Sequence, residues 1–219
     1  IMLELKDKLI AHEELEAGHA VQNALMPERT PLVPGWNLWL FTRSANEVGG
    51  DLVDFINISP DRVGVTVGDI AGKGLRAALL TAKLQATIRA LAPDLSSLSE
   101  LCQKLNSIFC RDSLPNIFAS VVYLEAQPNA GTIRLVNAGH FPPVILRGAQ
   151  LERTEKGGMA LGLSTQAVFQ EQRIELNTND MVFVYSDGLT EARNRRFSIC
   201  CRNSPRTLLN KSASACFPR

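Results

Sequence analysis

Residues 62–91 have the sequence RVGVTVGDIAGKGLRAALLTAKLQATIRAL, in which a strand pattern passes through a glycine-rich turn into a helix pattern. Valines at alternate positions of the first part predict a half-buried strand. Apolar residues at helical spacing predict a helix over residues 73–91. The side chains expected to form its apolar face are Leu75, Ala78, Leu79, Ala82 and Ala86. Asp69 lies between the two patterns, where the strand ends and the turn begins.

A second strand is predicted at residues 51–58, directly before the turn sequence Ser59-Pro60-Asp61. A hairpin centred on Pro60 places Asp51 opposite Asp69. Side chains at directly opposed positions of two antiparallel strands are close enough to meet. Two carboxylates held there repel each other unless a cation lies between them. The hairpin register therefore predicts a cation site at one end of these strands.

The rest of the chain predicts one more helix, which Ser96 or Ser97 caps and which runs to about Arg111. Only strands follow it. They are expected at residues 117–125, 132–136, 143–147, 167–176 and 181–186. Because runs of strands surround two long central helices, we expect an α+β sandwich rather than a sheet of alternating strand–helix–strand units.

The N-terminal residues 3–26 predict a helix of mixed charge that Pro27 ends. Small and apolar residues recur every seven positions along it, at Leu3, Ile10, Ala17 and Ala24. The companion positions are mostly polar, so two interpretations stay open. The segment is either a weak coiled coil or a solvated linker helix that leads out of an upstream domain.

Composition limits the classes of function. The 219 residues, 45% of them hydrophobic, can bury one sizeable core. Seven of the 23 basic residues and no acidic ones lie from Arg193 onward, which leaves an acidic body that suits cations and argues against nucleic acid. We also expect no membrane span, since there is no run of eighteen apolar residues. Five cysteines without a C-x-x-C pair argue against zinc or disulfides and predict a cytoplasmic protein.

Three aspartates lie in glycine-rich contexts at expected strand ends: Asp51 in EVGGD, Asp69 in GDIAGKG and Asp187 in YSDG. Each alone is explained by an ordinary turn or helix cap. Together they predict a site for a hard divalent cation such as Mg²⁺ or Mn²⁺, to which the Ile70 carbonyl would add an oxygen ligand. A phosphate-binding P-loop is excluded, because the spacing before Lys73 is one residue short and a glycine replaces the Ser/Thr that should follow it.

Four ordered segments carry a resemblance to a known family: EVGGDLVDF, VGDIAGKGLRAALLTAKLQATIRAL, NAGHFPPVILR and VYSDGLTEARN. Over about residues 20–194 the chain resembles the bacterial metal-dependent serine/threonine phosphatases of the SpoIIE/RsbU type, in the PPM (PP2C-like) superfamily. The resemblance implies an αββα sandwich of two antiparallel sheets with helices outside, and a binuclear Mn²⁺ or Mg²⁺ site. It matches Asp69 to the catalytic acid that bridges both metals, Asp51 and Asp187 to further catalytic metal ligands, and Ile70 to a backbone ligand.

The resemblance also implies an activity and partners. Such a domain hydrolyses phosphoserine or phosphothreonine by two-metal activation of water. It is typically the output of an upstream sensor domain and acts on a phosphorylated anti-sigma-factor antagonist; a homodimer is left open. Arg43 and Lys73 are candidates for holding the phosphate, although ordinary surface charge is the favoured interpretation of both. For His140, a turn residue that hydrogen-bonds nearby backbone is favoured over a proton donor.

The C-terminal residues depart from the family, whose closing segment carries an Asp-Asp motif with the remaining metal ligand. Here no acidic residue follows Glu191. We therefore expect a linker helix at residues 1–26, a phosphatase domain at residues 27–194, and an aberrant basic tail at residues 195–219. This departure leaves open a second function, that of a catalytically inactive PPM-like domain used for binding or dimerisation.

Overall fold

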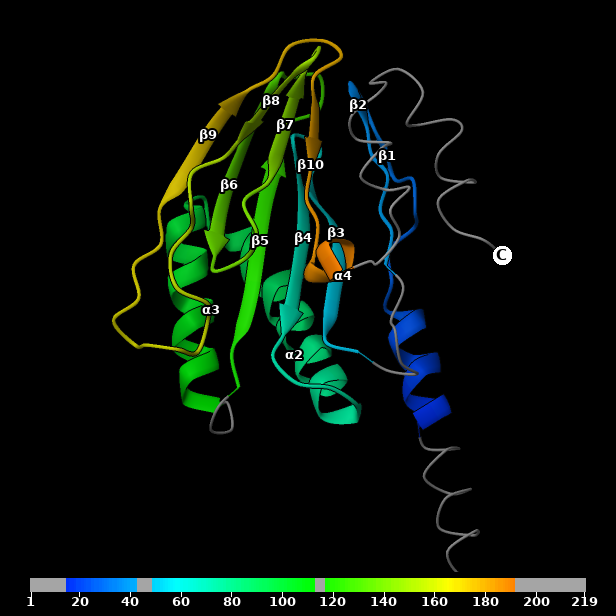
Figure 1. Cartoon of the computed structure of the whole chain (residues 1–219), viewed down its shortest axis with the longest axis vertical. Coiled ribbons are helices and arrows are strands. Elements are labelled where there is room, and N and C mark those ends of the chain that lie inside the picture. Colours follow the sequence, from blue (N-terminus) through cyan, green and yellow to red (C-terminus); the bar gives the residue numbers. More distant parts are fainter. Residues whose placement is uncertain (1–14, 43–48, 113–116, 192–219) are drawn as a thin grey trace, which may run out of the picture.

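The computed structural model describes residues 15–42, 49–112 and 117–191, and its strands form antiparallel sheets (Figure 1). A five-stranded sheet has the order β3-β4-β5-β6-β9, and a three-stranded sheet has the order β10-β7-β8. The larger sheet contains β3 (Asp51–Ser59), β4 (Arg62–Ile70), β5 (Ala119–Ala126), β6 (Thr132–Ala138) and β9 (Glu171–Glu175). The smaller contains β7 (Val144–Arg147), β8 (Gln150–Arg153) and β10 (Met181–Phe183), and a separate hairpin pairs β1 (Leu32–Val33) with β2 (Trp36–Asn37).

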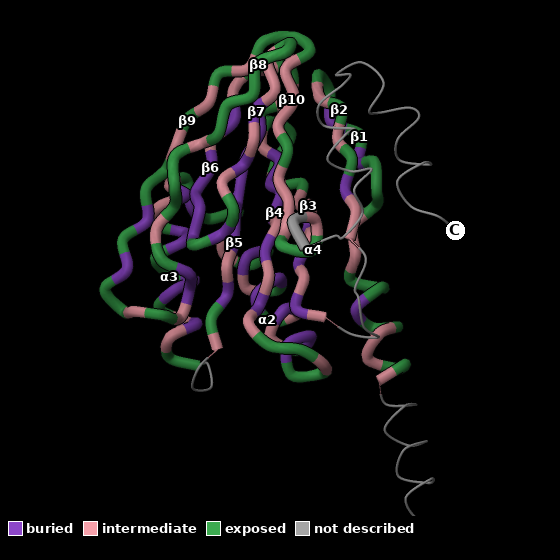
Figure 2. Tube along the Cα trace, in the orientation of Figure 1, coloured by how far each residue is buried: buried purple, intermediate pink, exposed green. Residues whose placement is uncertain are grey.

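Helices cover one face of the five-stranded sheet (Figure 1). They are α2 (Leu75–Leu91), the 3-10 turn η1 (Ala92–Asp94) and α3 (Leu98–Asp112). The main core lies between them and the sheet, where Ile88 and Leu101 pack with Tyr123 and Val136. Figure 2 shows this burial along β4, β5 and β6. The predicted α+β fold of antiparallel sheets flanked by helices is confirmed.

The other face of the five-stranded sheet is also buried. Val63 of β4 packs with Trp36 of β2 and Val182 of β10, and Val184 packs against the cluster that contains Val65. A sheet that is apolar on both faces needs a cover on each side. Here the cover on the second side comes from the β1–β2 hairpin and the β10 segment.

The predicted apolar face of α2 was largely wrong, since only Ala78 of its five residues is buried. Leu75 and Leu79 are 41% and 63% exposed, whereas the buried residues are Ala77, Ala78, Thr81, Leu84, Gln85 and Ile88. Two of these buried residues, Thr81 and Gln85, are polar. They can be buried because their side chains donate hydrogen bonds to backbone carbonyls, Thr81 to Gly50 at 2.9 Å and Gln85 to Leu25 at 2.9 Å. The buried side of this helix is therefore less apolar than the side that the spacing indicated.

Several element boundaries also differ from those expected. The strand expected at residues 167–176 covers only Glu171–Glu175, and the one expected at residues 181–186 ends at Phe183. The short helix α4 (Asp187–Glu191) follows it. Strand β8 was missed because all four of its residues are exposed, so no alternation of apolar residues marks it. None of the helices in the described parts of the chain is long and apolar enough to cross a membrane.

The N-terminal helix is described at residues 15–24, and its expected first part lies outside the described residues. Ala17 and Ala24 of the seven-residue pattern are exposed. The side chain of Gln22 forms two hydrogen bonds with the Gly49 backbone, at 2.9 and 3.2 Å. The end of this helix is thus tied to the segment that precedes β3, while the coiled coil stays a prediction.

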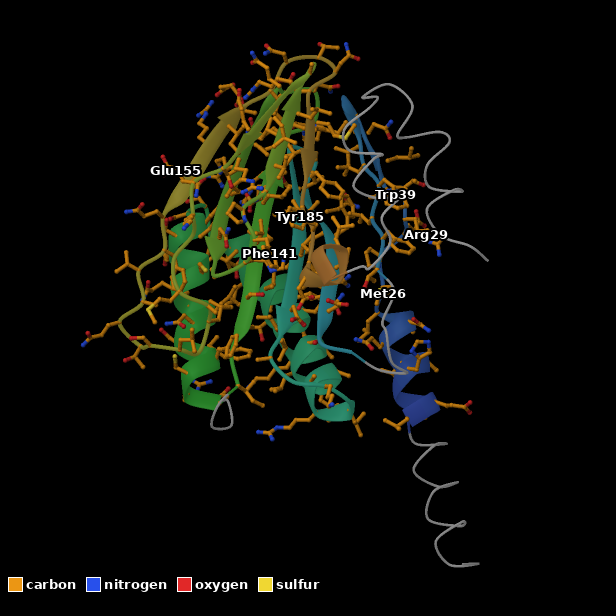
Figure 3. All side chains as sticks on the ribbon, in the orientation of Figure 1. Met26, Arg29, Trp39, Phe141, Glu155 and Tyr185 are labelled. Atoms are coloured by element: carbon orange, nitrogen blue, oxygen red, sulfur yellow. The ribbon has the colours of Figure 1, made fainter. Side chains whose placement is uncertain are left out.

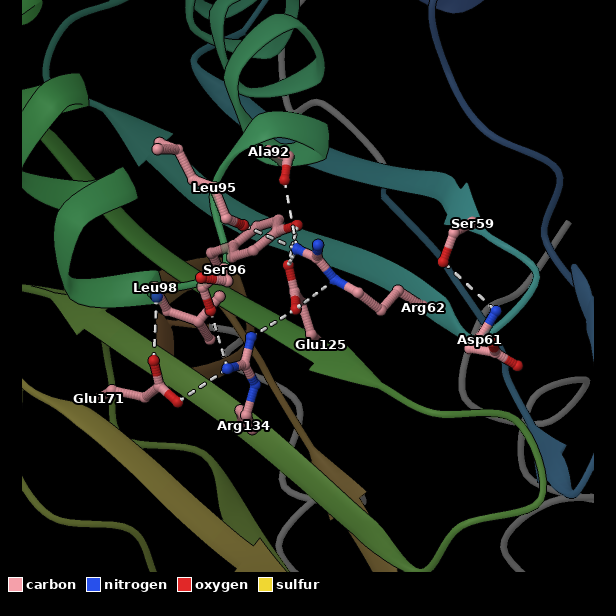
Figure 4. Close-up of polar contacts among 11 residues, drawn as sticks. Ser59, Asp61, Arg62, Ala92, Leu95, Ser96, Leu98, Glu125, Arg134 and Glu171 are labelled. Atoms are coloured by element: carbon pink, nitrogen blue, oxygen red, sulfur yellow. Dashed lines mark hydrogen bonds and ion pairs between the residues drawn. The ribbon is translucent and has the colours of Figure 1, made fainter.

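A buried ion-pair network fixes the helices to the sheet (Figure 4). The Glu125 carboxylate is 4% exposed and accepts hydrogen bonds from Arg62 at 2.8 Å and Arg134 at 2.8 Å. Arg62 also donates to two carbonyls at and just after η1. The Leu98 amide, at the start of α3, donates to the Glu171 carboxylate at 2.9 Å. Since each charged group has a partner, the network holds the start of α3 in place without an isolated buried charge.

Candidate metal centre

The β3–β4 hairpin brings the first two predicted acids together. Asp51 is the register partner of Asp69, as the turn sequence predicted. The pairing is regular from Asp51 to Asn57 and shifts only next to the turn, at Ser59. Because the irregularity lies at the far end of the hairpin, it leaves the two carboxylates opposite each other. The predicted register is therefore confirmed.

Gly50 makes the close approach of these groups possible. A Cβ atom at this position would lie 2.5 Å from the Ile70 carbonyl oxygen and 2.8 Å from Asp69 Oδ1. Gly50 also accepts hydrogen bonds from the Ile70 amide at 3.2 Å and from the Thr81 hydroxyl of α2 at 2.9 Å. Only glycine leaves room for both oxygens. The residue before Asp51 thus shapes the site, a role that the Gly-Gly-Asp sequence did not reveal.

Asp187 joins the pair as the first residue of α4, with three residues between it and the end of β10. Burial raises the pKa of Asp51, and the charge of Asp187 raises it further. The pKa of Asp69 is raised to about 6, first by burial and then by the charges of Asp51 and Asp187. A cation among the three would reverse both effects, since it favours the ionised carboxylates. Their oxygen donors suit a hard divalent cation.

The three aspartates are not arranged as a complete set of metal ligands. Among the residues that the structure describes, no group of three or more His, Cys, Asp or Glu side chains is arranged to hold a metal ion. Asp69 and Asp187 line one cavity of about 300 Å³, whereas Asp51 borders another between the N-terminal helix and α2. The structure thus gathers the three acids around the end of β4, with Asp51 on a different side from the other two.

Several residues that line the cavity beside Asp69 were not predicted from the sequence. Ser120, Phe141 and Lys156 line it together with His140. Ser120 is the register partner of Asp69 on β5, a relation that depends on a pairing between strands far apart in sequence. No motif marks Ser120 or Lys156, so no signal in the sequence could have found them.

His140 is held by three neighbours. Its amide donates to Asn137 Oδ1 at 2.8 Å, and Asn137 Nδ2 donates to the His140 carbonyl at 3.1 Å. Its Nδ1 lies 3.0 Å from the Ser120 hydroxyl. Burial lowers the pKa of His140, against the opposite effects of the Tyr185 backbone and the charge of Asp187. The residue lies in a turn, as favoured, but the hydrogen bonds there join its backbone to the Asn137 side chain, and its imidazole contacts Ser120 instead of nearby backbone.

The two candidate phosphate-binding residues, Lys73 and Arg43, and the nearby acid Asp54 are not among the residues that the structure places around the three aspartates. Lys73 is exposed in the turn before α2, and Arg43 lies outside the described residues. Asp54, also on β3, is 1% exposed and forms a bidentate pair with Arg89 of α2, with distances of 2.8 and 2.6 Å. Since its carboxylate is already neutralised by a guanidinium, Asp54 serves to fasten α2 to the sheet.

Comparison with protein families places the fold and the site in context. The family model described as Stage II sporulation protein E (SpoIIE) matches residues 59–215, which is most of the chain. The chain belongs to the SpoIIE family. The SpoIIE match includes Asp69 and Asp187, begins after Asp51, and extends into the expected basic tail.

The chain is similar to phosphoserine phosphatases of Bacillus subtilis. It is 27% identical to RsbP over 84% of this chain and 47% of RsbP, and 23% identical to RsbU over 82% of this chain and 54% of RsbU. It therefore spans about half the length of these relatives. The SiaA-PP2C domain of Pseudomonas aeruginosa has the same fold, with a TM-score of 0.74 at 18% identity over 96% of this chain and 88% of that one. This SpoIIE-family chain is thus similar to bacterial phosphoserine phosphatases and shares the fold of a PP2C domain.

Proposed function

We propose that this chain is the catalytic domain of a metal-dependent protein serine/threonine phosphatase. Its substrate would be phosphoserine or phosphothreonine on a bacterial signalling protein of the anti-sigma-factor-antagonist type. The observation that carries the proposal is the pairing of Asp51 with Asp69 next to the charge of Asp187. In a chain of this family, such a concentration of carboxylates is best explained by a divalent cation.

Each acid then has a proposed role toward a binuclear Mn²⁺ or Mg²⁺ centre. Asp69 would bridge both ions, Asp51 and Asp187 would each bind on one side, and the Ile70 carbonyl would add an oxygen ligand. Bound there, the ions would lower the pKa of a water molecule and offset the charge on the phosphoryl oxygens. Because Gly50 has no side chain, the Ile70 carbonyl oxygen and Asp69 Oδ1 would both be free to bind the same cation.

The cavity beside Asp69 is the proposed place for the phosphate. Lys156 borders this cavity and is exposed, so its ammonium group would attract a phosphate dianion from solvent. Phe141 borders the same cavity and is 40% exposed, which offers an apolar surface beside the phosphorylated residue. We therefore expect Lys156 to contribute more to substrate affinity than Lys73 does.

The proposal has consequences for partners and location. We propose that the chain acts in the cytoplasm, downstream of a sensor domain, on a protein rather than on nucleic acid. The acidic balance of the chain before Arg193 supports a cation-binding site and disfavours a nucleic-acid partner. A homodimer would bring two N-terminal helices together, and this stays open.

A second function has support of its own. The chain could be a catalytically inactive PPM-like domain that serves binding or dimerisation. No acidic residue follows Glu191 in the sequence, and the described acids form no closed metal-binding group. Both observations fit a domain that keeps the fold of the family but has lost a metal ligand.

Phosphate release from a phosphoserine protein, measured with and without Mn²⁺, separates the two functions. We expect metal-dependent release by the wild type and at least about a hundredfold less by Asp69→Ala, because the bridging ligand is lost. Asp61→Ala is the matched control, since Asp61 is exposed in the turn of the same hairpin. Release by the wild type no faster than by Asp69→Ala would contradict the enzyme and favour the inactive module.

A further inference from the structure

The loop between β6 and β7 connects the two sheets and carries His140, which is 7% exposed. On one side its Nδ1 lies 3.0 Å from the hydroxyl of Ser120. Ser120 is the register partner of Asp69, and its hydroxyl also lies 3.5 Å from the Asp69 carbonyl oxygen. The imidazole is thus joined through one hydroxyl to the strand pair that presents Asp69.

On its other side the same loop contacts the segment before Asp187. The Tyr185 backbone is close enough to the imidazole to raise the pKa of His140, while the buried Nε2 atom has no hydrogen-bond partner among the described residues. The neighbouring Phe141 ring stacks on the Tyr185 ring with centroids 5.5 Å apart, and it meets the His140 ring edge-on at 6.0 Å. Figure 3 shows Phe141 and Tyr185 close together on the same face. Two consecutive side chains therefore bear on the segment that ends at Asp187.

The loop itself has little freedom. Gly139 has φ +73°, and a Cβ atom there would lie 2.5 Å from the Ala160 amide nitrogen. The reciprocal hydrogen bonds between Asn137 and the His140 backbone close the turn. A rigid loop transmits the position of one sheet to the other, because its contacts cannot relax independently.

We infer that His140 is a positioning residue, which sets the separation of Asp69 and Asp187 by linking Ser120 of the five-stranded sheet to the Tyr185 segment that follows β10. The effect of this link on metal binding rests on the proposed function, whereas the link itself does not depend on a bound ion. Residues that orient metal ligands without touching the metal commonly change affinity by about 10- to 100-fold when replaced. We expect His140 to act in this range.

Backbone amide hydrogen exchange of the metal-free protein tests the link. His140→Asn keeps a polar group near Ser120 but is too short to reach the Tyr185 segment. Exchange over residues 184–189 should become at least about tenfold faster than in the wild type, while exchange in β3 and β4 stays unchanged. Ser120→Ala, which removes one hydroxyl from a half-buried position, should act in the same direction with a smaller effect and guards against a folding defect.

The matched control is Phe109→Leu, a core substitution on α3 that should destabilise the protein without touching the loop. Mn²⁺ affinity, measured by electron paramagnetic resonance of the free ion, should fall about 10- to 100-fold in His140→Asn and stay at the wild-type value in the control. Exchange over residues 184–189 that does not differ between His140→Asn and Phe109→Leu would overturn the inference. So would faster exchange with unchanged Mn²⁺ affinity. If the wild type binds no Mn²⁺, the proposed function is contradicted. The comparison of hydrogen exchange between His140→Asn and Phe109→Leu then tests on its own whether His140 links the two segments.

Discussion

Replacement of Asp69 by asparagine should stabilise the metal-free protein near neutral pH. The Asp69 carboxylate faces Asp51 across the hairpin, and burial and neighbouring charge raise its pKa from an ordinary 3.8 to about 6. A rise of this size corresponds to about 3 kcal/mol. Because the carboxylate is only half-buried, solvent screens part of the interaction, and we expect about 1.5 kcal/mol. Asparagine keeps the shape of the side chain and removes the charge.

The sign of the pH dependence follows from the direction of the pKa shift. The folded protein binds this proton more tightly than the unfolded chain does, so stability falls as the pH rises from about 4 to about 6. The variant lacks this titration. The advantage of Asp69→Asn over the wild type should therefore grow across this window and remain constant above it.

Urea unfolding followed by circular dichroism, in buffers containing a chelator between about pH 4 and about pH 7, measures this difference. Asp54→Asn is the matched control, because Asp54 lies on the same strand but pairs with Arg89, and its replacement should destabilise the protein. Stability curves of Asp69→Asn and the wild type that run parallel over this pH range would refute the reasoning, since they would mean that Asp69 carries no unbalanced charge.

Three further predictions concern the packing of the fold. Glu125→Ala should lower the free energy of unfolding by about 3 kcal/mol in urea titrations, because two partly buried guanidinium groups lose their partner; a loss below about 1 kcal/mol would contradict this. Gly64→Ala places a Cβ 2.5 Å from the Tyr123 hydroxyl and should cost about 2 kcal/mol, less when combined with Tyr123→Phe; equal losses in both backgrounds would show that this contact is not responsible. Leu84→Ala should cost about 3 kcal/mol and Leu79→Ala less than about 0.5 kcal/mol in thermal unfolding, because only the former is buried; the reverse order would restore the face that the spacing of α2 predicted.

The β3–β4 hairpin was predictable because its information is local. Alternating valines, a turn at Ser59-Pro60-Asp61 and a side-chain period of two leave few registers that bury the right face. The shift at Ser59 changed only the last pair, so the opposition of Asp51 and Asp69 survived. The α+β class was predictable for a related reason, since strand and helix patterns each depend on a few neighbouring residues.

The face that α2 buries could not be predicted in this way. Its spacing favoured Leu75 and Leu79, but the buried side includes Thr81 and Gln85, whose polar groups find carbonyl partners in segments far away in sequence. A hydrophobicity pattern cannot anticipate such partners, because they exist only after the chain has folded.

Local patterns alone therefore identified three glycine-flanked aspartates and paired two of them, since a strand, a turn and a strand determine that geometry within twenty residues. The place of Ser120 beside Asp69 arises from the pairing of β4 with β5, and the approach of Asp187 and His140 arises from the packing of the two sheets. Contacts between sheets depend on side chains that are distant in sequence and that pack only in the complete fold. The three aspartates could thus be identified from the sequence, whereas the distances between them that metal binding requires are set only by the packing of the folded chain.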